Sequence, residues 1–229
     1  MSRKLLLIHG WSDCSLSFVK LKDALSDIYL AENILFVDYE SREDNMTYGD
    51  VVDGLRDKLL SQNLLNTDGT AVRSVEFDVV VHSTGGLVIR EFITRFYPPE
   101  KLSSCPIKRI VMLAPANFGS PLAISGKSAL GSFLAGRKEV TNFLETGRLI
   151  LNGLELGSSY QWDLAERDVL HQEQYYSAET IQVTVLVGNG QYDGLRQVVN
   201  KPGTDGTVVI AGCNLNSARA SFNFSTGDY

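Results

Sequence analysis

The sequence predicts an α/β fold with a mostly parallel sheet and helices on both faces. Five short apolar runs rich in Val, Ile and Leu recur along the chain, and amphipathic segments separate them. Such runs are typical of strands that are buried on both sides of a parallel sheet. Because strands and helices alternate, helices are expected to cover both faces. The predicted strands are Leu5–Ile8, Ile34–Val37, Phe77–Val81, Ile110–Leu113 and Val183–Val187.

Three segments between these runs predict helices, namely Phe18–Leu25, Tyr48–Leu60 and Gly86–Phe96. The second shows the pattern most clearly, since its apolar residues recur at three- and four-residue spacing and form one stripe. These residues are Val51, Val52, Leu55, Leu59 and Leu60.

A long segment, from about Gly119 to Ala178, separates the last two predicted strands. It holds several helix-like pieces and is too long for a plain loop, so it predicts a helical cap between core parts 1–118 and 179–229 of a single domain. Two ordinary helices covering the sheet are the alternative. One apolar face would comprise Val140, Phe143, Leu144 and Leu151, and another Trp162, Leu164, Ala165 and Val169.

Composition sets the class of protein and its expected partners. The 229 residues, 44% of them hydrophobic, are enough for one domain with a large core. A net charge of −6 argues against nucleic acid or an anionic membrane as a partner. No segment reaches the ~20 apolar residues of a transmembrane helix. Lacking a signal-peptide pattern, the chain is expected in the cytoplasm, although a protein whose leader had been removed would look the same. Cys14, Cys105 and Cys213 form no CxxC motif and are expected to be reduced, mostly buried thiols.

The most specific chemical signal surrounds Ser83, in Val79-Val-Val-His-Ser-Thr-Gly-Gly86. A serine at a turn from strand to helix has a strained backbone that exposes its Oγ above the sheet, and the glycines after it allow helix and strand to approach closely. The backbone N–H of Thr84 would then face a developing oxyanion, with the helix dipole behind it. A serine that merely caps a helix is the alternative.

A second signal is the strand that ends in His9-Gly10-Trp11. Ester hydrolysis passes through a tetrahedral oxyanion, which is stabilised by two preorganised donors. The N–H of Trp11 is the expected partner of the Thr84 N–H. His9 is then expected to hold the turn by hydrogen bonds and not to act as the base. A simple glycine turn is the alternative.

Two aspartates after the last predicted strand could orient a histidine. Asp205 lies in Pro202-Gly-Thr-Asp-Gly-Thr-Val-Val-Ile210, and Asp193 lies in Gly190-Gln-Tyr-Asp-Gly194. Each is followed by a glycine, so each could equally belong to a β-turn. In chain order, both follow the serine, as the acid of a hydrolase triad does.

Together these motifs resemble the α/β-hydrolase superfamily and, within it, bacterial serine esterases and lipases. The resemblance covers nearly the whole chain and is strongest at Val80–Gly86, Leu113–Pro121 and Asp205–Val208. It implies that Ser83 is the nucleophile, that Asp205 rather than Asp193 is the acid, and that loop Ala114–Ser120 leads into a lid. It also implies hydrolysis of a small-molecule or lipid ester without a metal or organic cofactor. Thioesterase, amidase or phospholipase activity on the same machinery, or an inactive fold that serves as a binding module, are the alternatives.

Two features depart from the pattern of that superfamily. Val81 stands where the first glycine of Gly-x-Ser-x-Gly is usual, which implies a slightly wider spacing between helix and strand. The superfamily order is serine, acid, histidine, yet no histidine follows Asp205, since the chain has only His9, His82 and His171. The closing strand and helix of the fold are also expected to be missing, and the base is expected beyond Tyr229. A rearranged triad that uses His171 is the alternative.

Overall fold

The computed structural model describes residues 3–11, 13–124, 147–190, 201–215, 223 and 225–227. Within them, five strands form one sheet in the order β2-β1-β3-β4-β5, and every neighbouring pair is parallel. The predicted parallel α/β fold and all five predicted strands are confirmed. The strands are β1 (Arg3–Ile8), β2 (Ile34–Val37), β3 (Glu76–His82), β4 (Ile107–Leu113) and β5 (Gln182–Leu186).

The strand order determines where a crevice opens. The chain runs from β1 outward to the edge strand β2, and then crosses to β3 on the other side of β1. In open parallel sheets, ligands bind beyond the carboxyl ends of the strands at such a reversal. Here the reversal lies between β1 and β3, where Ile8 pairs with Val81. His9-Gly10 and His82-Ser83 therefore leave the sheet side by side.

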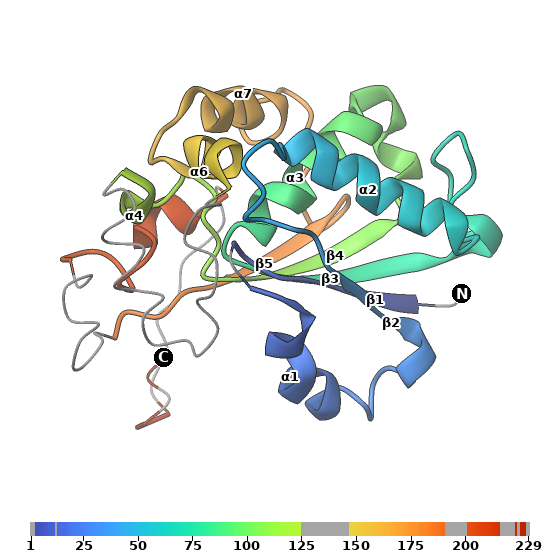
Figure 1. Cartoon of the computed structure of the whole chain (residues 1–229). Coiled ribbons are helices and arrows are strands. Elements are labelled where there is room, and N and C mark those ends of the chain that lie inside the picture. The colour runs from blue at the N-terminus through green and yellow to red at the C-terminus, as the bar shows by residue number, and fades with distance from the viewer. Residues whose placement is uncertain are drawn as a thin grey trace.

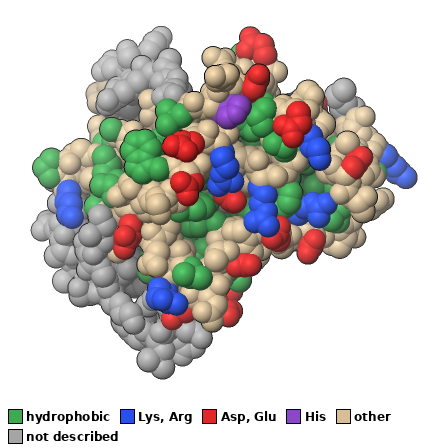
Figure 2. All heavy atoms as spheres, turned by 90° about the horizontal axis from the view of Figure 1, so that it is seen from above, with side chains coloured by type: hydrophobic (Ala, Val, Ile, Leu, Met, Phe, Trp, Pro, Cys, Tyr) green, Lys and Arg blue, Asp and Glu red, His purple; other side chains and the backbone are tan. Residues whose placement is uncertain are grey.

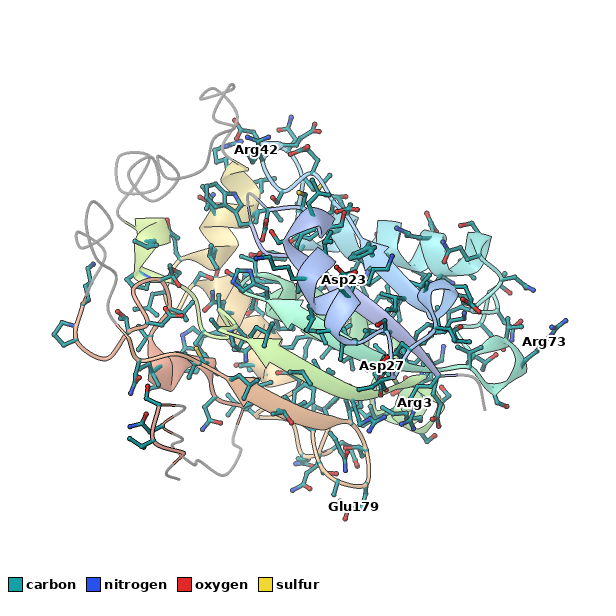
Figure 3. The ribbon with its side chains drawn as sticks, turned by 90° about the horizontal axis from the view of Figure 1, so that it is seen from below. Arg3, Asp23, Asp27, Arg42, Arg73 and Glu179 are labelled. Carbon is teal, nitrogen blue, oxygen red and sulfur yellow. The ribbon has the colours of Figure 1, made fainter. Side chains whose placement is uncertain are left out.

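Helices cover both faces of the sheet (Figure 1). The short 3-10 helix η1 (Ser15–Phe18) and α1 (Val19–Ala24) lie below it, whereas α2 (Tyr48–Ser61), α3 (Gly85–Phe96), α6 (Arg148–Leu154) and α7 (Ser159–Arg167) lie above. Seen from below, α1 with Asp23 lies near β1, and among the described residues no helix covers β4 and β5 on this side (Figure 3). The remaining helices are short: η2 (Ala31–Asn33), η3 (Val72–Ser74), η4 (Pro99–Ser104), α4 (Pro121–Ile124) and η6 (Ile210–Cys213).

The three predicted helices are confirmed, and their surroundings explain their patterns. The apolar stripe of α2 is buried against α3 and the sheet, and Thr47 and Asp50 form a capping box at its start. By contrast, α3 is buried on nearly every side, from Gly85 to Thr94. A helix that is surrounded in this way requires cover on its outer side. Here α2 and α7 pack on it. The outer surface of this layer carries acidic and basic side chains mixed together (Figure 2).

A buried ion pair joins α3 to the segment predicted as a cap. The Arg90 guanidinium donates two hydrogen bonds to the Asp168 carboxylate, at 2.7 and 2.9 Å, and both side chains are fully buried. The Tyr176 hydroxyl also donates to Asp168, at 2.7 Å. Helices α6 and α7 thus pack on α2 and α3. Residues 125–146, including Val140, Phe143 and Leu144, lie outside the described residues, so the cap at 119–178 stays a prediction.

One residue of α7 differs from the prediction. Trp162 was placed on the apolar face of α7, but its side chain is 55% exposed. The buried face lies one position earlier, because Gln161 is buried together with Leu164 and Ala165. The three thiols are free and mostly buried, as predicted: Cys105 and Cys213 are buried and Cys14 is exposed. Burial raises the pKa of Cys105 and of Cys213 to about 12. None of the described helices is long and apolar enough to cross a membrane.

Candidate active site

Ser83 lies at a sharp turn between β3 and α3. Its φ of 52° is in the left-handed region, which costs a residue with a side chain about 1–3 kcal/mol. Backbone hydrogen bonds hold the turn: the Ser83 N–H donates to Leu113 O, and Ser83 O accepts from the N–H groups of Gly86 and Ala116, each at 3.1 Å. Ser83 is partly exposed. The strained turn expected of a nucleophilic serine is therefore present.

Two glycines allow this turn to fit against the end of β1. A Cβ placed on Gly10 would lie 2.8 Å from Ser83 Cβ, and one placed on Gly85 would lie 2.7 Å from Ile8 O. Contacts this short do not occur between real side chains, so the backbone at residues 10 and 85 is in direct contact with its neighbours. The His9-Gly10 turn consequently lies against Ser83.

His9 is a buried part of this turn, with only 1% of its surface exposed. Its Nε2 accepts a hydrogen bond from the Tyr39 N–H at 3.3 Å, and its Nδ1 lies 2.8 Å from Gly10 O. Since Nε2 is an acceptor, the proton is on Nδ1, which donates to Gly10 O. Both ring nitrogens are therefore occupied, and His9 has no nitrogen available to take a proton from Ser83.

The same hydrogen bond orients the amide of Trp11. Gly10 O and the Trp11 N–H belong to one planar trans peptide, in which the two groups point in opposite directions. Because the His9 ring holds Gly10 O on one side, the Trp11 N–H points to the other. On the Ser83 side, Thr84 precedes the first residue of α3, where the first N–H groups of a helix have no partner within it. The Thr84 amide thus lies directly after Ser83, and the Trp11 amide follows the Gly10 backbone that lies against Ser83 Cβ.

Asp205 lies in a tight turn that fixes its carboxylate. Its Oδ1 accepts from the Thr207 N–H at 2.8 Å, the Thr207 hydroxyl at 2.9 Å and the Val208 N–H at 2.8 Å. All three bonds end on the same oxygen, and none of them uses Oδ2. A carboxylate held in this way can present its second oxygen to an imidazole N–H. The rival acid, Asp193, lies outside the described residues.

The loop Ala114–Ser120 connects the serine turn to the segment that carries Asp205. At its start, the Ala116 N–H donates to Ser83 O. Further along, Asn117 Nδ2 donates to Cys213 O at 2.8 Å, and the Ser120 hydroxyl donates to Thr207 O. The loop is held from the helix layer as well, because Arg90 Nη1 donates to Asn117 O at 2.6 Å. Sequence reasoning singled out this loop only as a path to a lid, and it missed this bridging role.

The other two histidines lie in different places. His82 adjoins Ser83, its side chain is 41% exposed, and its Nδ1 is 3.8 Å from Asp13 Oδ2. His171 is exposed, contacts Tyr175 edge-on, and accepts from the Glu173 N–H. It belongs to the segment that leads into the amino end of β5, whereas Ser83 follows the carboxyl end of β3. The contacts of its ring are thus with Tyr175 and Glu173, in the segment between α7 and β5, and not with residues of the serine turn.

Tyr39 is a second residue that sequence reasoning missed. It follows β2 at the carboxyl edge of the sheet, and its ring stacks on the His9 ring at a centroid distance of 4.4 Å. Its position directly after a predicted strand was the only signal in the sequence. As for metals, the described residues include no group of three or more His, Cys, Asp and Glu side chains that could share one.

Comparison with solved structures confirms the fold. Phospholipase PlaB from Legionella pneumophila matches with a TM-score of 0.70 and 28% sequence identity, over 93% of this chain and 46% of PlaB. The mature lipase BlEst2 from Bacillus licheniformis gives a TM-score of 0.61 at 14% identity, over 93% of this chain and 79% of BlEst2. The metagenomic carboxyl esterase MGS0156 gives 0.55 at 17% identity, over 92% and 59%. This chain spans less than half the length of PlaB.

The chain therefore has the α/β-hydrolase fold, as the sequence motifs predicted. No curated protein matches the chain in sequence. The profile of a family described as a domain of unknown function (DUF7379) matches residues 1–129, which is more than half of the chain. The chain therefore belongs to the DUF7379 family.

Proposed function

We propose that the protein is a serine hydrolase that cleaves carboxylic esters through an acyl-enzyme on Ser83. The observation that carries this proposal is the left-handed φ of Ser83 at the junction of β3 and α3, with the Gly10 backbone in contact with its Cβ. A strained serine in such a position is the usual nucleophile of this fold. Similarity to a phospholipase, a lipase and a carboxyl esterase supports an ester as the substrate.

In the proposed mechanism, Ser83 Oγ attacks the ester carbonyl carbon while a histidine accepts the hydroxyl proton. Asp205 orients this histidine through Oδ2 and stabilises its cation. The N–H groups of Trp11 and Thr84 donate to the oxyanion of the tetrahedral intermediate. Collapse of the intermediate expels the alcohol, which takes the proton from the histidine, and leaves the acyl group on Ser83. Water then releases the acid by the same steps in reverse.

One observation favours a different function, a binding module without catalysis. Both ring nitrogens of His9 are occupied, and the ring of His171 contacts Tyr175 and Glu173 rather than the serine turn. An inactive hydrolase fold would keep the serine turn for structural reasons and would bind an ester or acyl group without cleaving it.

Labelling the full-length native protein with a fluorophosphonate, followed by peptide mapping, distinguishes a hydrolase from an inactive binding module. A hydrolase should be labelled at Ser83 and should turn over a short-chain nitrophenyl ester. Replacing Ser83 by alanine should reduce kcat by about 10³-fold or more without lowering the melting temperature. Unlabelled Ser83, or turnover that survives Ser83→Ala, would contradict the proposed function.

A further inference from the structure

Tyr39 contacts both halves of the proposed oxyanion site. Its hydroxyl lies 3.1 Å from His9 O, in the turn that carries Trp11, and 3.2 Å from the hydroxyl oxygen of Thr84. Its main-chain N–H donates to His9 Nε2, and its ring lies nearly parallel to the His9 ring, at an interplanar angle of 7°. One residue thus joins the ends of β1, β2 and β3.

The direction of these hydrogen bonds follows from the single proton on the phenol. Burial raises the pKa of Tyr39 well above its usual value of 10, so the hydroxyl keeps its proton. His9 O can only accept, so the phenol donates to it. The Thr84 hydroxyl then donates to the phenol oxygen. A chain of two hydrogen bonds therefore runs from Thr84 through Tyr39 to His9 O.

We propose that Tyr39 is a positioning residue that holds the Trp11 and Thr84 amides at the separation an oxyanion requires. This inference rests on the proposed function, because it assigns a role within the same site. On the β1 side, Tyr39 fixes the carbonyl of His9 through its hydroxyl and the tautomer of His9 through its main-chain N–H. That tautomer determines the direction of the Trp11 N–H. On the α3 side, Tyr39 holds the side chain of the residue whose N–H is the other donor.

The chemistry predicts which step depends on Tyr39. Binding the ground-state ester makes little use of the oxyanion donors, whereas the tetrahedral intermediate depends on both. A fault in their spacing should therefore lower kcat and leave KM nearly unchanged. A tyrosine that only fills space would instead lower the melting temperature without this separation of kcat from KM.

The test uses Tyr39→Phe, which removes the hydroxyl and keeps the stacked ring. Thr84→Val breaks the same chain of bonds from its other end and keeps the Thr84 N–H, whereas Thr84→Ser keeps both the N–H and the hydroxyl. Tyr97→Phe is the matched control, since the buried Tyr97 hydroxyl donates to a backbone carbonyl, Gly69 O, at 2.7 Å. Tyr97 lies at the end of α3, about 18 Å along the helix from Ser83.

We expect Tyr39→Phe and Thr84→Val each to lower kcat on a nitrophenyl ester by about 10- to 100-fold. This is less than the roughly 10²–10³-fold decrease in kcat that follows removal of a direct oxyanion donor. KM should change by less than about two-fold, and a trifluoromethyl ketone, whose adduct with serine carries an oxyanion, should bind more weakly by the same factor as kcat. The double variant should be no more than about three-fold slower than either single variant, because both break one chain of bonds. Thr84→Ser, which keeps the hydroxyl, should lose less kcat than Thr84→Val, and Tyr97→Phe should keep kcat within about two-fold.

Three results would overturn the inference. A Tyr39→Phe variant with the kcat of Tyr97→Phe would show that the hydroxyl positions nothing. Losses that multiply in the double variant would show that Tyr39 and Thr84 act separately. An unchanged affinity for the trifluoromethyl ketone would show that the oxyanion donors are unaffected. If Ser83 is labelled and essential in the wild type, these results contradict only the role of Tyr39, whereas turnover that survives Ser83→Ala contradicts the proposed function too.

Discussion

Replacing Gly10 by alanine tests whether contact between the β1 turn and the nucleophile sets the rate. The new Cβ would lie 2.8 Å from Ser83 Cβ, 3.2 Å from His82 O and 3.3 Å from His82 Nδ1. Gly10 is not among the residues with positive φ, so alanine fits its backbone conformation. The cost is therefore steric and falls on the serine turn.

The size of the effect follows from the overlap. Carbon atoms in contact lie about 3.5–4.0 Å apart, so the turn and Ser83 must separate by at least roughly 0.7 Å. A misplacement near 1 Å at a reacting centre costs about 10²-fold in rate. Overpacking a tight site costs about 1–3 kcal/mol of stability. We expect Gly10→Ala to lower kcat by about 10²-fold and to stay folded.

The assay is kcat on a short-chain nitrophenyl ester together with the melting temperature, and Gly54→Ala is the matched control. Gly54 is exposed within α2, and no atom lies within 4 Å of its would-be Cβ, so alanine there should stabilise the helix by about 0.5–1 kcal/mol and leave kcat unchanged. If Gly10→Ala folded and kept wild-type kcat, contact at Ser83 Cβ would not control the geometry of the site.

Two further predictions concern the proposed acid and the buried ion pair. Asp205→Asn should lower kcat by about 10⁴-fold, because an amide favours the wrong tautomer of the histidine. His171→Ala should leave kcat within about two-fold, because the ring of His171 contacts Tyr175 and Glu173 rather than the serine turn; the reverse result would make His171 the base. Asp168→Asn should cost about 3 kcal/mol in urea unfolding, since it leaves the charge of Arg90 buried without its partner, whereas Asp53→Asn in the exposed Asp53–Arg95 pair should cost less than about 1 kcal/mol. Equal losses at Asp168 and Asp53 would refute the reasoning from burial.

The sheet was predictable because its strands are short, apolar and buried on both faces. Runs such as Leu5–Ile8 and Phe77–Val81 have the same pattern whatever lies beyond them, and the turns that follow contain the glycines that a close approach requires. Ser83 could be found for the same reason, since a serine between a buried strand and a Gly-Gly helix start is a local signal. The fold and the turn at Ser83 were therefore visible within windows of about ten residues.

The contacts that organise the site were not visible in the sequence, because they join distant residues. Tyr39 meets Thr84 across 45 positions, and Asn117 meets Cys213 across 96. Tyr39 and Cys213 belong to no motif, and a tyrosine after a strand is ordinary. Trp162 is a second case: its apolar side chain predicted burial, but the face of α7 that packs inward carries the neighbouring residue Gln161 instead. Tertiary packing decided both cases.

Val81 shows how the chain tolerates its departure from Gly-x-Ser-x-Gly. The side chain is completely buried, and a Cβ on Gly85 would lie 3.3 Å from Val81 Cβ. The valine therefore occupies space that exists only because residue 85 is glycine. The same glycine brings α3 against Ile8 O, where a Cβ would lie at 2.7 Å. One glycine thus serves both contacts, and it brings the start of α3 against the end of β1 next to the turn that backbone hydrogen bonds hold at Ser83.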